Sequence, residues 1–240
     1  MAAGAFLRYP YFSDFTYCKG LYMPTVSLSL HRLLRALAVA ATLLAGAAQA
    51  VPDAPLQSAL ARFSAAQGGD RDAIDQAADQ FAALLRAEPT HPVLMAYTGA
   101  ATALRATTTW LPWKKMAYAE DGLALLDKAL ALPTPANSAA ALRGVPVALE
   151  TRLVAANTFL AVPGFMNRSA RGARLLGEVL ASPLLAQAPL EFQGAVWLRA
   201  AKLAQAENRL DDARRYLDAA LAHQVPQASA ARAQREALAP

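Results

Sequence analysis

A helical periodicity in residues 194–227 constrains the fold more than any other feature of the sequence. Within it, large apolar residues and alanines recur at spacings of three and four from Trp197 to Ala204, and again after Asn208. This spacing places them on one face of an α-helix. The segment therefore predicts two antiparallel amphipathic helices joined by a tight turn.

The amino-acid composition supports an all-α fold for the rest of the chain. Alanine accounts for 60 of the 240 residues, whereas aromatic residues make up only 8% and charged residues 17%. Alanine is the best helix former, and its small side chain lets helices pack closely. The same figures argue against an aromatic-rich β-sandwich and against a disordered chain.

The segment from residue 194 resembles the tetratricopeptide repeat (TPR), a helix-turn-helix unit of about 34 residues. In that family a large apolar residue stands at position 4, small residues at positions 8, 20 and 27, and a bulky residue at position 24. Counted from Gly194, the residues at these five positions all have the expected size, and they are Trp197, Ala201, Ala213, Leu217 and Ala220.

Three weaker units precede this one, at 58–91, 92–133 and 145–183, the last matching only in its helix-pair rhythm. In the first unit we expect Asp70 or Asp72 to cap the second helix. Residues 227–238 would form a last helix with a polar face, as the end of a repeat array requires. The resemblance implies a right-handed α-solenoid of about four TPR-like antiparallel helix pairs plus a C-terminal capping helix.

Residues 1–50 are predicted to be a leader that is absent from the mature protein. From Met23 a short basic segment precedes about fifteen apolar or small residues that end in Ala-Gln-Ala at 48–50, which is the pattern of a secretory signal peptide. We expect cleavage after Ala50, which leaves a TPR-like domain of residues 51–240 in the periplasm or outside the cell. An uncleaved anchor and an alanine-rich buried helix are the alternatives.

Residues 1–22 fit poorly before such a signal, and we interpret them as an over-extended start. They contain Cys18, the only cysteine, so the mature protein would have no disulfide and no cysteine-ligated metal.

The net charge of +5 does not indicate nucleic-acid binding. A net +3 lies in residues 1–50, and the remaining 190 residues carry 19 basic and 17 acidic side chains. Binding to a phosphate backbone requires a basic surface that a domain of this charge lacks. We therefore expect no nucleic-acid partner.

Residues suited to catalysis are scarce. The mature chain has two histidines, His91 and His223, both near predicted helix ends, where a capping role is expected. It contains no metalloprotease, serine-hydrolase or phosphate-loop motif. We predict a non-enzymatic protein with no cofactor and no metal. The competing hypothesis is a hydrolase or muramidase that uses Glu150 with Glu178 or Glu191 as its carboxylate pair.

An insertion at 107–118 is a candidate partner-binding segment. It contains Trp110 and Trp113, two of the three tryptophans, followed by Lys114 and Lys115. Large apolar area beside positive charge suits a protein partner, an anionic glycan or a peripheral membrane contact. Alternatively, the tryptophans fold back over the helices of their own unit.

A second candidate is a basic stripe formed by Arg168, Arg171 and Arg174, which recur every third residue along a predicted helix. Such a stripe could hold an acidic partner or a phosphate-bearing ligand. The alternative is that these arginines are solvated and bind nothing specific.

TPR-like proteins bind extended peptides or helices in a groove lined by the first helix of each pair. Carried onto this sequence, the polar groove positions are Arg62, Glu150, Asn157, Lys202 and Gln205. The lysine-and-asparagine set that clamps a terminal carboxylate in some members is not reproduced.

The resemblance therefore implies a protein-interaction scaffold or adaptor, serving a cell-envelope complex. The alternative is a periplasmic carrier that holds a lipid or other apolar small molecule inside the solenoid, with the 107–118 insertion closing the mouth.

Overall fold

The computed structural model describes residues 53–132 and 141–238. The predicted leader, with its signal peptide and Cys18, lies outside the described residues. Nine α-helices fill most of the described part of the chain, and the predicted all-α class is confirmed. They are α2 (Asp53–Gln67), α3 (Arg71–Ala87), α4 (Pro92–Leu104), α5 (Pro112–Ala131), α7 (Val147–Phe159), α8 (Ser169–Ala181), α9 (Leu190–Ala206), α10 (Leu210–Ala222) and α11 (Ala228–Glu236).

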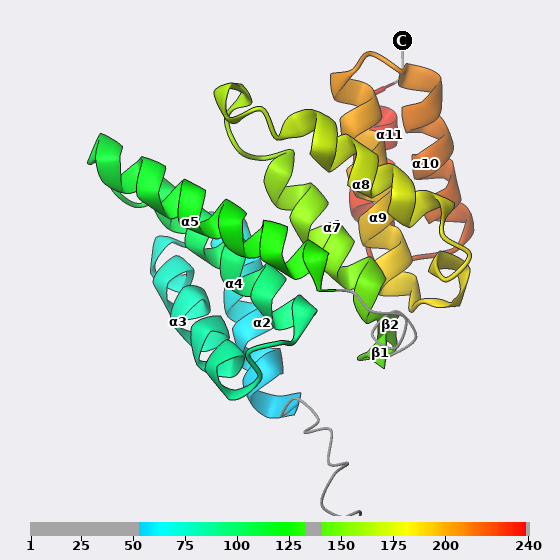
Figure 1. The fold of residues 1–240 in the computed structure, drawn as a ribbon. Coiled ribbons are helices and arrows are strands. Elements are labelled where there is room, and N and C mark those ends of the chain that lie inside the picture. The colour runs from blue at the N-terminus through cyan, green and yellow to red at the C-terminus, as the bar shows by residue number, and fades with distance from the viewer. Residues whose placement is uncertain (1–52, 133–140, 239–240) are drawn as a thin grey trace, which may run out of the picture. The chain divides into compact units, whose positions relative to one another are not determined.

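Consecutive helices pack in pairs, α2 on α3, α4 on α5, α7 on α8, and α9 on α10. Within each pair the two helices run in opposite directions (Figure 1). Each pair contacts the next, through α3 and α4, through α4 and α7, and through α8 and α9, while α11 packs on α10. Three short 3-10 helices, at Arg105–Thr107, Gly164–Met166 and Leu185–Gln187, lie in the connections.

A small hairpin precedes α7. Its strands β1 (Ala141–Leu142) and β2 (Val145–Pro146) pair antiparallel, and a two-residue turn joins them. Both turn residues, Arg143 and Gly144, have positive φ, at 52° and 78°. This is the backbone of a type I′ turn, whose twist matches that of the paired strands.

Capping side chains set where two of the helices begin. The carboxylate of Asp70 accepts hydrogen bonds from the main-chain N–H groups of Asp72 and Ala73 at 3.1 and 3.2 Å, as the sequence predicted for this helix start. His91 caps α4, since its Nδ1 accepts from the N–H of Leu94 at 3.5 Å. Burial lowers the pKa of His91, which favours the neutral form that this acceptor role requires.

Small residues stand where paired helices cross. A Cβ atom added to Gly99 would lie 2.7 Å from the carbonyl oxygen of Gly122, so α4 and α5 touch backbone to backbone. In the next pair, a Cβ at Gly172 of α8 would lie 3.1 Å from the carbonyl oxygen of Ala156 of α7. No larger side chain fits at these crossings without moving a helix.

Three aromatic rings join α2, α3 and α4 in the first half of the core. The rings of Phe81 and Tyr97 stack with centroids 4.9 Å apart, and Phe63 meets both edge-on at 6.0 and 5.3 Å. Such pairs each add about 0.5–1.5 kcal/mol beyond the area that they bury. This cluster fixes the face of α4 from which the Tyr97 hydroxyl extends.

Candidate functional site

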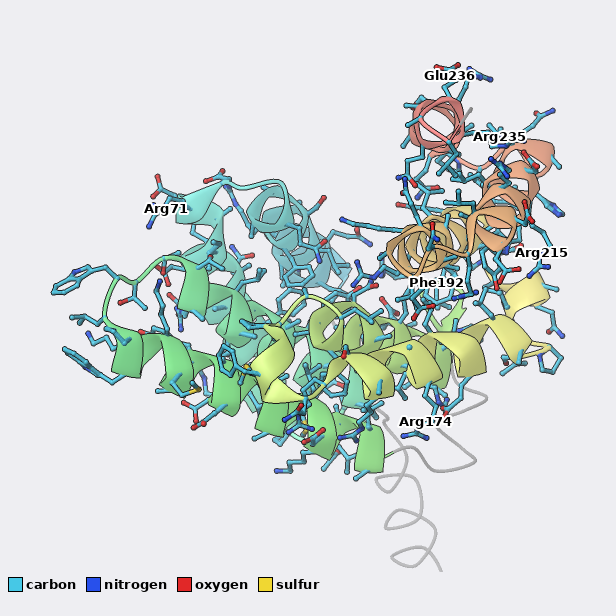
Figure 2. The ribbon with its side chains drawn as sticks, turned by 90° about the horizontal axis from the view of Figure 1, so that it is seen from above. Arg71, Arg174, Phe192, Arg215, Arg235 and Glu236 are labelled. Atoms are coloured by element: carbon cyan, nitrogen blue, oxygen red, sulfur yellow. The ribbon has the colours of Figure 1, made fainter. Side chains whose placement is uncertain are left out.

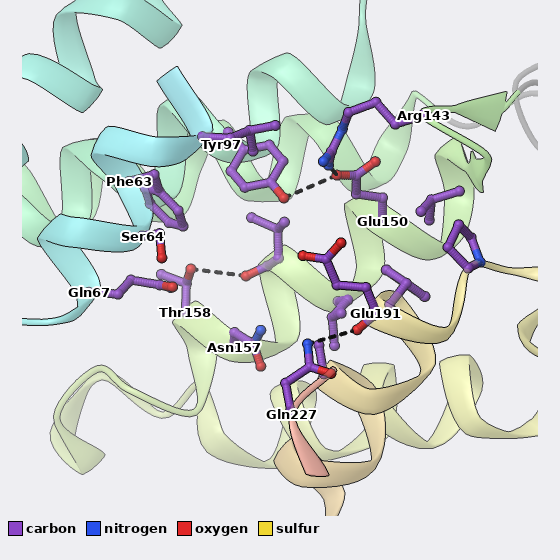
Figure 3. A pocket seen from close by; sticks show the side chains of 17 residues that line it. Phe63, Ser64, Gln67, Tyr97, Arg143, Glu150, Asn157, Thr158, Glu191 and Gln227 are labelled. Carbon is purple, nitrogen blue, oxygen red and sulfur yellow. Dashed lines mark hydrogen bonds and ion pairs between the residues drawn. The ribbon is translucent and has the colours of Figure 1, made fainter. Parts of the chain in front are cut away.

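An open groove of about 440 Å³ lies between helices α2, α4, α7 and α9 (Figure 3). The hairpin and Gln227, just before α11, complete its walls. Each of the four lining helices is the first member of a consecutive pair. The second members, α3, α5, α8 and α10, contribute no lining residue.

The walls of the groove combine apolar and polar side chains. Leu60 and Phe63 come from α2, Leu153 and Val154 from α7, and Phe192 from α9. They form an apolar surface large enough to contact a few side chains of a bound molecule. The polar groups occupy defined places along this surface.

Glu150 is the buried charged group of the groove, with its side chain only about 3% exposed. Its Oε1 accepts hydrogen bonds from the Tyr97 hydroxyl at 3.0 Å and from Arg143 Nη2 at 2.7 Å. Its Oε2 has no partner among the described residues. Burial raises the pKa of Glu150, and the bonds from Arg143 and Tyr97 only partly oppose that effect.

The two partners of Glu150, Tyr97 and Arg143, were not among the site residues that we predicted from the sequence. Burial and the nearby Glu150 carboxylate raise the pKa of Tyr97, so its hydroxyl remains a donor. Arg143 stands at the positive-φ turn of the hairpin, which holds its guanidinium over the start of α7. The Arg-Gly pair was the signal for a two-residue turn.

The opposite wall of the groove carries amide groups and a second carboxylate. Gln227 Nε2 donates to the main-chain oxygen of Glu191 at 3.1 Å, and Arg199 donates to that of Asn157 at 3.2 Å. The Glu191 carboxylate extends into the groove on the side of Glu150 (Figure 3). Within residues 53–132 and 141–238, no ion pair to Glu191 is present.

The charged residues of the lining are therefore Arg143, Glu150 and Glu191. Arg143 pairs with Glu150, so the negative charge of Glu191 is not matched within the groove. A bound molecule that brings a positive group would find it complementary.

The structure brings together only some of the residues predicted for a groove. Glu150 and Asn157 line it, whereas Arg62, Lys202 and Gln205 are exposed elsewhere on α2 and α9 and line no part of it. On α2 the lining face runs through Leu60, Ser64 and Gln67, and Arg62 lies about two positions off that face. On α9 the lining residues lie in the first two turns, far from residues 202 and 205.

The three arginines of the predicted basic stripe are paired with carboxylates of the chain. Arg168, directly before α8, and Arg171 in its first turn both bind the carboxylate of Asp127 on α5, with Arg168 at 3.1 Å. Both guanidinium groups also lie over the ring of Phe159. Arg174, which projects outward from α8 (Figure 2), pairs with Glu178 at 3.0 Å. Two of the three thus hold α8 against α5.

The 107–118 insertion is not a loop folded over its own unit. Pro112 begins α5, so Trp113, Lys114 and Lys115 lie in the first turn of a helix, where proline is favoured. The side chains of Trp110 and Trp113 are 82% and 66% exposed, which overturns the interpretation that they cover the helices. Nor does this segment line the groove, so it does not close its mouth.

The carboxylates of the hydrolase hypothesis are divided between two places. Glu178 pairs with Arg152 and Arg174 outside the groove, at 3.3 and 3.0 Å. Glu191 shares the groove with Glu150, whose Oε1 accepts hydrogen bonds from Tyr97 and Arg143.

The two histidines stand at helix ends, His91 before α4 and His223 after α10, and His223 also packs against Trp197. Across the described ranges, no three histidine or acidic side chains gather as a metal site would require. None of the helices described is long and apolar enough to cross a membrane.

No protein-family model matches the chain, and neither a curated protein nor a solved structure is significantly similar to it.

Proposed function

We propose that this protein is an exported, non-enzymatic TPR-like adaptor that binds an extended segment of another protein in the groove. In this proposal residues 51–240 form a right-handed solenoid of four helix pairs and a capping helix. The signal peptide is removed after Ala50, and the domain serves a complex of the cell envelope.

One observation carries the proposal, namely that only the first helix of each pair lines the groove. When helix pairs stack in register, their first helices line one common surface. A ligand on that surface would contact all four pairs, and no single pair could form the site alone. This is the arrangement that the resemblance implies for peptide binding.

The chemistry of the groove is suited to a peptide. Its apolar wall can receive side chains, and its amide and carboxylate groups can bind the main chain or a basic residue. Because Glu191 is the unmatched charge, we expect bound segments to contain lysine or arginine.

The proposal is tested by selecting peptides from a displayed random library on the purified protein. Ser64 is exposed and lines the groove on α2, so Ser64→Arg should fill the groove and leave the core intact. Ser169→Arg on α8 is the matched control, since Ser169 is also exposed and lines no part of the groove. We expect selected peptides to lose about tenfold or more in affinity with Ser64→Arg only.

Failure to select any peptide would contradict the adaptor function. A lipid that co-purifies with the protein from its own cells and is detected by native mass spectrometry would then favour the carrier. Equal affinity of the Ser64→Arg and Ser169→Arg variants for a selected peptide would place the binding site outside the groove.

A further inference from the structure

Exposed apolar side chains gather where α5 begins. In the described part of the chain six large hydrophobic side chains are exposed, and four of them lie on α5 or beside it. They are Trp110, Trp113, Met116 and Phe165. We call the segment 110–116, together with Phe165, the tryptophan tip.

The residues of the tip come from the start of α5 and from the two segments beside it. Trp113 and Met116 are three residues apart on α5 and therefore share one face. Phe165, in the connection between α7 and α8, lines the same shallow depression as Met116, and its side chain is 68% exposed. Trp110 directly precedes the helix and is 82% exposed. No groove described above receives either tryptophan ring.

The chain around the two tryptophans is basic. From Pro89 to Ala119 the sequence has no aspartate or glutamate, whereas Lys114 and Lys115 are both exposed in the first turn of α5. Arg105, the other cation of this stretch, is already paired with Asp75 and Asp79 at 2.7 Å. Glu120, which lines the same depression as Met116 and Phe165, and Asp121 follow further along α5, so the net positive charge of the helix is confined to its first turn.

Tryptophan and lysine together are the side chains that bind at a lipid-water interface. The tryptophan ring buries its apolar body while its N–H stays near the headgroups, and lysine is attracted to anionic lipids. The two lysines increase affinity for an anionic surface by about fivefold each. Tryptophan rings that project into solvent fit a bilayer surface better than they fit the concave pockets in which protein hot spots bind.

We infer that the tryptophan tip docks the protein on the surface of an anionic lipid bilayer, with Trp110 and Trp113 in the interface and Lys114 and Lys115 at the headgroups. This contact is peripheral, because α5 also carries Glu120, Asp121 and Asp127 and does not span a membrane. The inference is independent of the groove, which the tip does not line.

Vesicle binding of the purified protein tests the inference. The chain has three tryptophans, and Trp197→Phe leaves only Trp110 and Trp113 of the tip as fluorescent reporters. We expect their emission to shift to shorter wavelength with vesicles of phosphatidylcholine and phosphatidylglycerol at 70:30, and the protein to sediment with them. Binding to vesicles of pure phosphatidylcholine should be weaker by about tenfold or more.

Two paired variants separate the tip from other causes of binding. One double variant combines Trp110→Ala with Trp113→Ala, and the other combines Lys114→Gln with Lys115→Gln. Each should reduce sedimentation of the protein with anionic vesicles about tenfold or more. Leu210→Ala and Lys202→Gln, an exposed leucine and an exposed lysine elsewhere, are the controls and should bind as the unaltered protein does.

Absence of binding to anionic vesicles would overturn the inference, and would leave a protein partner as the occupant of the tip. Equal binding to both kinds of vesicle, or binding that neither pair of tip substitutions weakens, would also overturn it.

Discussion

At the scale of one residue, Gly122 shows why small residues stand where helices cross. A Cβ atom there would lie 2.5 Å from the carbonyl oxygen of Gly99 and 2.7 Å from the main-chain nitrogen of Ala103. Backbone atoms cannot turn aside as a side chain does, so α5 would have to move away from α4. The alanine excess of the sequence thus reflects close helix crossings as well as helix propensity.

We predict that Gly122→Ala lowers the free energy of unfolding by about 1–3 kcal/mol. Gly177→Ala in α8 is the matched control, because nothing lies within 4 Å of its added Cβ. There the substitution should raise stability by about 0.5–1 kcal/mol, since alanine is the better residue in a helix interior. Urea unfolding measures both, and a Gly122→Ala protein as stable as the unaltered one would contradict the close crossing.

Glu150 makes the stability of the protein depend on pH in a defined direction. Its pKa in the folded protein is raised above the ordinary value of 4.5, chiefly by burial. The folded state therefore holds this proton more tightly than the unfolded state does. The contribution of Glu150 to stability is fully present below about pH 4.5 and is lost as the pH rises through the raised pKa.

The comparison that isolates this effect uses Glu150→Gln, which keeps an acceptor for Tyr97 and Arg143. We predict that the unaltered protein loses stability relative to Glu150→Gln as the pH rises from 4.5, as measured by urea unfolding at a series of pH values. A difference between the two proteins that is constant, or that changes in the opposite direction, would contradict the burial of an ionisable Glu150.

At the scale of helices, two boundaries followed from local signals in the sequence. Asp70 begins α3 as expected, and Asn208 separates α9 from α10 with φ at 60°. Pro112 was such a signal as well, but the tryptophans and lysines around it led us to expect an insertion. Side-chain chemistry suggested a special segment, whereas the backbone preference of proline at a helix start decided the structure.

Ion pairs between helices were not predictable from spacing on one helix. Arg168 and Arg171 met the pattern of a basic stripe, but Asp127 lies about forty residues earlier in the sequence and becomes their neighbour only in the folded chain. The same holds for Arg143, Glu150 and Tyr97, which come from a turn and two helices. A single sequence contains the residues of such clusters but not the contacts between them.

We predict that Asp127→Asn lowers the free energy of unfolding by about 1 kcal/mol, because two half-buried guanidinium groups lose their shared carboxylate. The control is Asp211→Asn, which breaks the pair with Arg214 at a side chain that is 99% exposed. It should leave unfolding by urea unchanged. Equal effects of the two substitutions would mean that the ion pairs of Asp127 with Arg168 and Arg171 contribute no more to stability than an exposed ion pair does.

At the scale of the molecule, the periodicity of the sequence was enough to predict an all-α protein built of consecutive helix pairs. The groove was only partly predictable. All five polar groove residues were assigned by repeat position. Glu150 and Asn157 of α7 line the groove, whereas Arg62, Lys202 and Gln205 do not. The start of α9, which supplies Glu191 and Phe192, lies before the matched repeat and was missed.

The central claim is that a partner segment occupies the groove, and site-specific photocrosslinking in the cells that make the protein tests it most directly. Gln67 and Gln205 are both exposed on first helices, but only Gln67 lines the groove. With p-benzoylphenylalanine at position 67 we predict a discrete protein adduct that Ser64→Arg abolishes, and none at position 205. Adducts of equal yield at both positions, or an adduct at 67 that persists with Ser64→Arg, would contradict the claim.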